Sequence, residues 1–322
     1  MTILQFKRTR VAVLAVATGL TLAACGGNDS TGGGDGESVS GPVVIDGSST
    51  VEPLSSAAAE LFMGEHPDAN VTVGTSGTGG GFAKFCAGET DISDASRPIK
   101  DSEIAACQAK GIQYSQLVVA NDALSVVVNN DNTWTDCLTV GQLNTIWAPD
   151  STVNNWNQVD PSFPDEPLQL FGAGSDSGTF DYFTQAINGT EGASRTDYNP
   201  TEDDNITVQG VSATKGALGY FGYSYLEANA DKVKGVKIDS GGGCVAPSAQ
   251  TAQDGTYKPL SRELFIYVSD AALQKPQVVA FADFYLESNQ EIVEAAKFIP
   301  LTPAQLQVAQ TELDALNAKA GN

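Results

Sequence analysis

Residues 46–51 read DGSSTV and lead straight into apolar residues at helical spacing, namely Val51, Leu54, Ala58, Leu61 and Phe62. Similar segments rich in Ser, Thr and Gly are TSGTGGGF at 75–82 and SDSGTF at 175–180, the latter followed by Phe183 and Ile187. Each segment is therefore predicted to start a helix, although each one alone also suits an ordinary cap or turn. The first turn of a helix carries free N–H groups and a partial positive charge, and neighbouring hydroxyls add neutral donors. Three such starts directed at one point would bind a small oxyanion.

The N-terminus has the pattern of an export signal. Lys7, Arg8 and Arg10 precede an apolar run at 11–22, which is about half the length that a membrane-spanning helix needs. The string LAAC, ending at Cys25, resembles the lipobox of bacterial lipoproteins, although its small residues also suit an ordinary signal peptidase. The lipobox predicts a signal peptide at 1–24, a lipid on Cys25 and a flexible tether at 25–41.

The chain is strongly acidic. Its 322 residues carry a formal net charge of −22, and loss of residues 1–24 would leave 14 basic and 39 acidic residues, a net charge of −25. Such a surface argues against binding nucleic acid, and against binding anionic lipid by charge. It does not exclude an anion ligand, because exposed charges are screened over about 8 Å while a pocket responds mainly to its nearest dipoles.

Four cysteines remain besides Cys25, and they allow three pairings in an oxidising compartment. We expect Cys86 to pair with Cys107, because both lie on neighbouring helical segments, and Cys137 to pair with Cys244. A metal site is the alternative, but the chain has no CxxC motif and one histidine. The sequence therefore predicts two disulfides, no metal and no cofactor.

Short apolar runs alternate with helical patterns from Pro42 onward, which is typical of an α/β domain with a mainly parallel sheet. Asn121 and Asp122 interrupt a long apolar stretch, and this polar break indicates a crossing between two domains. The apolar strand LFIYVS at 264–269 then returns the chain to the first domain. The predicted division is lobe I at 42–122 and 266–322, with lobe II at 123–265 inserted. Further helices are expected at 51–63, 81–87, 101–110, 139–147, 178–188, 276–286, 289–297 and 303–317.

Five ordered strings resemble one known family: DGSSTVEP, SGTGGGFAKFCAGETDISDASRPIK, GSDSGTFDYF, TEDDNITVQGV and GALGYFGYSY. They are similar to the PstS-type phosphate-binding proteins of ABC phosphate importers, most of all to the SphX-like branch, and the resemblance covers residues 42 to about 300. It implies a type II periplasmic-binding-protein fold, with two α/β lobes joined by two hinge crossings and closing over one phosphate.

The resemblance also implies the phosphate-binding residues. Many relatives have a phosphate-facing Asp in the loop where this chain has Ser96 followed by Arg97, and an arginine where it has Ala173, four residues before Ser177. We therefore expect the positive charge of the site at Arg97, with Arg195 as a second candidate. The ligand positions carried over are Ser49, Thr50, Ser76 or Thr78, Ser96, Arg97, Ser177, Gly178 and Thr179.

Hydrogen phosphate carries a proton near neutral pH, so its site needs an acceptor that sulfate would leave unsatisfied. The candidates are Asp176, then Asp46 and Asp94, although each is equally suited to an N-cap or a solvated loop. We predict that Asp176 favours phosphate over sulfate.

A secreted serine hydrolase is the alternative from another class, because GSDSG around Ser177 looks like the serine loop of chymotrypsin-like proteases. That chemistry needs a base, and His66 lies in the turn that closes the first predicted helix. We therefore predict a receptor rather than an enzyme: a lipid-anchored monomer, at the outer face of the cytoplasmic membrane or in the periplasm, that passes inorganic phosphate to the membrane subunits of an ABC permease. Other ligands (molybdate or sulfate) and a role as phosphate sensor remain alternatives.

Overall fold

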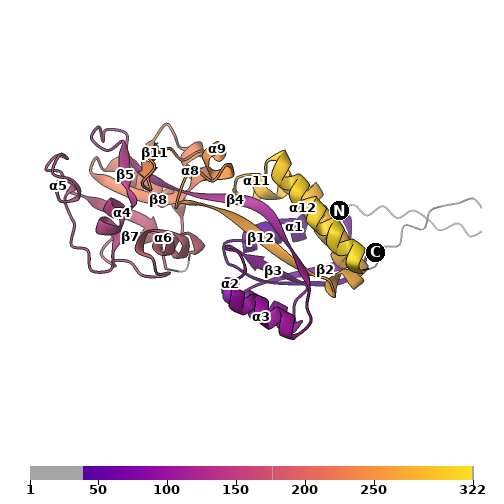
Figure 1. The fold of residues 1–322 in the computed structure, drawn as a ribbon. Helices are drawn as coiled ribbons and strands as arrows, with labels where there is room; N and C mark the ends of the chain where they lie inside the picture. Colours follow the sequence, from indigo (N-terminus) through magenta and orange to yellow (C-terminus); the bar gives the residue numbers. More distant parts are fainter. Residues whose placement is uncertain (1–38, 176, 321–322) are drawn as a thin grey trace, which may run out of the picture. The chain divides into compact units, whose positions relative to one another are not determined.

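The computed structural model describes residues 39–175 and 177–320 (Figure 1). The predicted signal peptide, most of the tether, Cys25 and Asp176 lie outside these described residues. In the part of the chain that the structure describes, no helix combines the length and the apolarity needed to cross a membrane.

The first part of the chain alternates strands and helices, as the apolar pattern predicts. It consists of β1 (Gly41–Gly47), α1 (Glu52–Glu65), β2 (Ala69–Thr75), α2 (Gly77–Ala87), β3 (Ile92–Ala95), α3 (Asp101–Ala109) and the long strand β4 (Tyr114–Asn129). The middle part consists of β5 (Cys137–Thr139), α4 (Val140–Trp147), α5 (Trp156–Val159), β6 (Gln169–Ala173), α6 (Gly178–Asn188), β7 (Asn199–Thr201), α7 (Asp204–Ala213), β8 (Ala217–Gly222), α8 (Tyr223–Ala228), β9 (Val233–Gly235), β10 (Lys237–Asp239), β11 (Cys244–Val245) and α9 (Ala249–Gln253). The last part consists of β12 (Ser261–Ser269), η1 (Ala272–Gln274), α10 (Pro276–Glu287), α11 (Asn289–Ala295) and α12 (Pro303–Ala320).

Nine of these strands form one sheet, in the order β2-β1-β3-β12-β4-β8-β6-β7, with β9 also paired to β4. β1 is parallel to β2 and to β3, and β6 is parallel to β7 and to β8. β12 is antiparallel to β3 and to β4, and Figure 1 shows β4 and β12 running beside each other. A second, three-stranded sheet has the order β11-β10-β5.

β12 separates two hydrophobic clusters, because its residues alternate between the faces of the sheet. Leu264, Ile266 and Val268 belong to the cluster that includes residues of α1 and α10–α12. Phe265 and Tyr267 belong to a smaller cluster with residues of α2 and α3. The first part of the sheet is therefore covered by helices on both faces.

β4 changes both its partner and its core midway. It pairs with β12 up to Ala123 and with β8 from Leu124 onward. After this point Leu124, Val126 and Val128 join a different cluster, built with residues of α4, α6 and β8. The change of partner occurs directly after Asn121 and Asp122, the polar break from which the sequence predicts a crossing.

Both predicted disulfides are present, which confirms the expected pairing. Cys86 in α2 is bonded to Cys107 in α3. Cys137 in β5 is bonded to Cys244 in β11, and both of these strands pair with β10. Each disulfide therefore links two elements that lie close together in the fold, α2 with α3 and β5 with β11.

Candidate functional site

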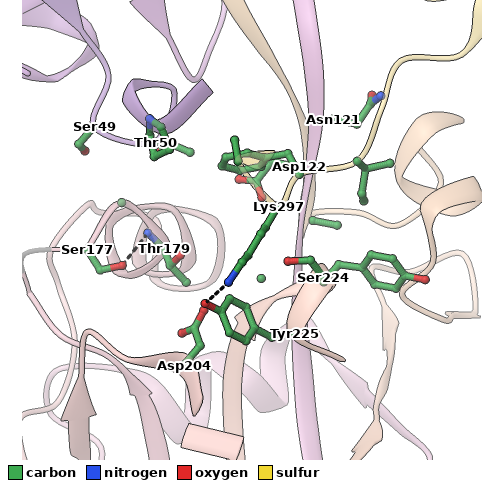
Figure 2. Close-up of a pocket in the computed structure, with 18 residues that line it drawn as sticks. Ser49, Thr50, Asn121, Asp122, Ser177, Thr179, Asp204, Ser224, Tyr225 and Lys297 are labelled. Carbon is green, nitrogen blue, oxygen red and sulfur yellow. Dashed lines mark hydrogen bonds between the residues drawn. The ribbon is translucent and has the colours of Figure 1, made fainter. Parts of the chain in front are cut away.

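A pocket of about 260 Å³ lies where β4 changes its partner (Figure 2). Its lining comes from segments that are distant in the sequence: the loop before α1, the start of α6, the middle of β4, the start of α7, the start of α8, and residues 296–299 after α11. The predicted ligand residues in its lining are Ser49, Thr50, Ser177, Gly178 and Thr179.

The first and third Ser/Thr/Gly segments face each other in this pocket, and Figure 2 shows Ser49 and Thr50 opposite Ser177 and Thr179. Ser177 caps α6, because its Oγ accepts a hydrogen bond of 3.1 Å from the N–H of Thr179. A Cβ placed on Gly178 would lie only 2.5 Å from Thr50 Oγ1. The two helix starts therefore approach as closely as a glycine allows.

The second segment makes a neighbouring cluster and is not part of this lining. Ser76 precedes α2, and its hydroxyl donates to Asp46 Oδ1. Thr78 Oγ1 lies 3.2 Å from Ser96 Oγ and accepts a hydrogen bond of 3.3 Å from the N–H of Ser96. The structure thus brings the second segment together with Ser96, another predicted ligand residue, beside the start of α2.

Arg97 is paired with an acid. Its two terminal nitrogens lie 2.9 and 2.8 Å from the carboxylate oxygens of Glu103, and its guanidinium lies 5.7 Å from the centre of the Phe82 ring. Burial acts to raise the pKa of Glu103, but the hydrogen bonds from Arg97 and Lys100 outweigh it and lower that pKa. Arg97 is nevertheless close to the start of α2, because a Cβ on Gly79 would lie 3.8 Å from its Nη2.

Arg195, the second candidate cation, holds loops together. Its side chain is buried, bonds both oxygens of Asp197 at 2.6 and 2.9 Å, and donates to the carbonyls of Ile146 and Val153. It does not line the pocket.

The two described candidates for the proton acceptor also lie outside the pocket lining. Asp46 pairs with Lys84 at 2.6 Å, and its hydrogen bonds from Lys84 and Ser76 lower its pKa despite burial. Asp94 is fully buried and accepts a hydrogen bond of 2.8 Å from Ser55 in α1, and burial raises its pKa to about 7.

Sequence reasoning missed Arg262, a cation that contacts Thr50 in the first segment. Its Nη2 donates to Thr50 Oγ1 at 3.2 Å, and its Nε donates to Asp122 Oδ2 at 3.1 Å. Its guanidinium stacks 3.7 Å from the centre of the Tyr182 ring in α6. The predicted strand at 264–269 leaves Arg262 outside, whereas β12 begins at Ser261 and sets Arg262 directly opposite Asp122 in the ladder.

Two charged residues that do line the pocket, Lys297 and Asp204, were also not predicted as site residues. Lys297 has a φ of 60° and extends across the pocket in Figure 2, where its Nζ lies 3.3 Å from the hydroxyl of Tyr225. Asp204 stands at the start of α7, after Asp203 caps this helix through the N–H of Asn205. Burial and the charge of Asp203 raise the pKa of Asp204 to about 6, although Lys297 opposes this rise. Of the three acids at 202–204, Asp204 therefore lines the pocket at the start of α7, while Glu202 and Asp203 are exposed.

His66 stands at the C-terminal end of α1, where its ring packs 4.6 Å from that of Phe62. The Ser/Thr segment stands at the opposite end of the same 14-residue helix, which is roughly 20 Å long. This separation argues against a Ser–His pair at the pocket.

Known proteins resemble this chain over most of its length. Protein SphX of Synechococcus elongatus is 48% identical over 273 residues, which cover 84% of this chain and 80% of that protein. The phosphate-binding protein PstS of Staphylococcus saprophyticus is 38% identical over 307 residues, which cover 95% and 93% of the two chains. Among solved structures, a possible phosphate binding protein from Planctomyces limnophilus superposes with a TM-score of 0.83 at 51% identity, covering 87% of this chain and 99% of that one.

The mixed α/β structure of this chain and its superposition on that solved structure agree with the two-lobe periplasmic-binding fold that the resemblance implies. The PBP superfamily domain matches this chain over residues 32–289, which is well over half of the sequence. With its mixed sheet, its helices on both faces and its pocket of facing helix starts, this chain belongs to the PBP superfamily.

Proposed function

We propose that this protein is a non-enzymatic receptor that binds inorganic phosphate outside the cytoplasm and delivers it to an ABC importer. One observation carries the proposal: Ser49 and Thr50 before α1 and Ser177 to Thr179 at the start of α6 face each other across one pocket. The names of the relatives, which include a phosphate-binding protein, support the same ligand.

The chemistry of the pocket suits an oxyanion in an acidic chain. The free N–H groups of a helix start carry partial positive charge, and hydroxyls donate without adding formal charge. Such donors act at hydrogen-bonding distance, whereas the acidic surface is screened over about 8 Å at physiological salt.

We assign the remaining ligand contacts to the neighbouring cluster of Ser76, Thr78, Ser96 and Arg97. Thr78 and Ser96 are already hydrogen-bonded to each other, and Arg97 lies against the first turn of α2. In this proposal Arg97 exchanges part of its pairing with Glu103 for the anion when the ligand binds.

We propose that lobe I, at 42–122 and 266–322, and lobe II, at 123–265, close over the anion about the crossings in β4 and β12. A lipid on Cys25 would hold the receptor at the outer face of the membrane as a monomer, from which it delivers phosphate to the permease.

Isothermal titration calorimetry tests which anion the protein binds. The protein used is the full-length chain carrying Cys25→Ser, which prevents lipidation. Phosphate and its analogue arsenate are expected to bind, and sulfate and molybdate to bind more weakly. Thr50→Val removes one pocket hydroxyl and is expected to weaken phosphate binding by about tenfold, a typical loss for a hydrogen bond to a charged group. Thr72→Val, on β2 and outside the pocket lining, is the matched control and should bind as the parent does.

Tight binding of molybdate or sulfate without phosphate would establish the other oxyanion as the ligand and refute the proposal. Asp176→Asn and Asp204→Asn, titrated with phosphate and sulfate, test which carboxylate accepts the phosphate proton. The variant that loses discrimination between the two anions identifies the acceptor.

A further inference from the structure

Arg262 lies beside the pocket and contacts two of its lining residues, Thr50 and Asp122. Its side chain is 16% exposed and contacts Asp122 in β4, Thr50 before α1 and Tyr182 in α6. Its Nη1 also lies 3.5 Å from the backbone oxygen of Ser96, at the outer limit of a hydrogen bond. One guanidinium therefore touches both crossing strands and two of the predicted ligand loops.

The position of this guanidinium is fixed by groups outside the ligand loops. Arg262 and Asp122 are directly opposite on adjacent antiparallel strands, so the ladder sets the distance between their backbones. The carboxylate of Asp122 holds Nε, and stacking on Tyr182 sets the plane of the fork. The donors of Arg262 are therefore in place before any anion enters.

The contact with Thr50 determines what the threonine hydroxyl can do. An arginine only donates hydrogen bonds, so in the 3.2 Å contact Thr50 Oγ1 is the acceptor. The single proton of that hydroxyl must then point away from the guanidinium. The same oxygen faces the start of α6, because a Cβ on Gly178 would lie 2.5 Å from it.

From this geometry we propose that Arg262 is a positioning residue, which fixes the hydroxyl of Thr50 as a hydrogen-bond donor toward the bound anion. The inference rests on the proposed function, because the anion is the inorganic phosphate assigned above. Arg262 acts here through Thr50, in contrast to a cation that attracts phosphate directly.

A double-mutant cycle separates these two mechanisms. The four proteins are the full-length Cys25→Ser chain, Thr50→Val, Arg262→Met and the combination of both changes, each titrated calorimetrically with inorganic phosphate. Arg262→Met is expected to weaken binding about tenfold when Thr50 is present and less than about twofold in the Thr50→Val background. Thr50→Ser retains the hydroxyl and should restore the tenfold effect of Arg262→Met.

Conservative variants keep the test valid if Arg262→Met folds poorly. Arg262→Lys retains the charge but has a single ammonium, which cannot hold Asp122 and Thr50 in the same fork. Its phosphate affinity should therefore fall by most of the tenfold expected for Arg262→Met. Combining Asp122→Asn with Arg262→Met avoids leaving an unpaired buried carboxylate, and thermal unfolding of every variant reports folding separately from affinity.

The affinities of these variants decide whether Arg262 acts through Thr50. Equal losses in both Thr50 backgrounds, full affinity in Arg262→Lys, or unchanged affinity in Arg262→Met would overturn the positioning role while phosphate binding by the parent stands. Failure of the parent chain itself to bind phosphate would instead refute the proposed function, and the positioning role with it.

Discussion

Replacing Asp94 by asparagine should remove a large part of the pH dependence of this protein's stability. The carboxyl group of Asp94 is fully buried behind α1, where Ser55 Oγ donates to its Oδ1 at 2.8 Å. Its Oδ2 has no hydrogen-bond partner among the described residues. Burial dominates, and it raises the pKa of Asp94 to about 7 although the hydrogen bond from Ser55 opposes the rise.

The direction of the pH dependence follows from which state, folded or unfolded, binds the Asp94 proton more tightly. The unfolded chain releases the Asp94 proton near its ordinary pKa of 3.8, whereas the folded chain keeps it up to a pKa of about 7. The stability that this proton provides is therefore complete below about pH 4 and is lost as the pH rises through about 7. A shift of about three pKa units corresponds to about 4 kcal/mol in the free energy of unfolding.

Urea unfolding followed by circular dichroism, from about pH 4 to about pH 8, measures this effect. Asp94→Asn should match the parent at the acidic end and exceed its stability at the alkaline end by up to about 4 kcal/mol. Asp46→Asn is the control of opposite sign, because the lowered pKa of Asp46 makes its contribution constant above about pH 5. If the free energy of unfolding changes with pH in the same way for Asp94→Asn and the parent, the raised pKa of Asp94 is refuted as the cause.

Two glycines, one at the start of α6 and one in the second turn of α2, give contrasting predictions. Gly178→Ala should weaken phosphate binding, measured by calorimetric titration, because its Cβ would lie 2.5 Å from Thr50 Oγ1. The same change should alter the free energy of unfolding, measured in urea, by no more than about 1 kcal/mol, because alanine favours the helical conformation of α6. Gly81→Ala should lower the free energy of unfolding by about 1–3 kcal/mol, since its Cβ would lie 2.5 Å from the Cα of Gly47, and the same urea unfolding measures it.

Much of the architecture can be predicted from local patterns, because the buried faces repeat along the chain. The apolar spacing of Val51, Leu54, Ala58 and Phe62 is that of the buried face of α1. Asn121 and Asp122 mark the crossing in β4 because the strand there leaves one hydrophobic cluster before it enters the next.

The charged part of the site could not be predicted in the same way. Arg262 meets Asp122 through a strand register that joins positions 140 residues apart, and this register is a property of the whole sheet. Lys297 reaches Tyr225 from a backbone with positive φ, which is uncommon outside glycine and carries no sequence signal in a lysine. The start of α7 did have a local signal, since Asp203 precedes the buried Thr207, Val208 and Val211.

Lys297 crosses the pocket and contacts the hydroxyl of Tyr225, but three other cations beside the pocket are already paired with acids. Arg97 is paired with Glu103, Arg262 with Asp122, and Lys84 with Asp46, so each of these cations already has a carboxylate partner. A paired guanidinium still has spare N–H donors, and these can fix a hydroxyl or meet an oxyanion at little cost in net charge. Recognition would then depend on how many donors are correctly aimed and on one acceptor for the ligand's proton. Because such contacts act within hydrogen-bonding distance, the geometry of the Ser and Thr hydroxyls, rather than the charge of −22, sets which anion fits.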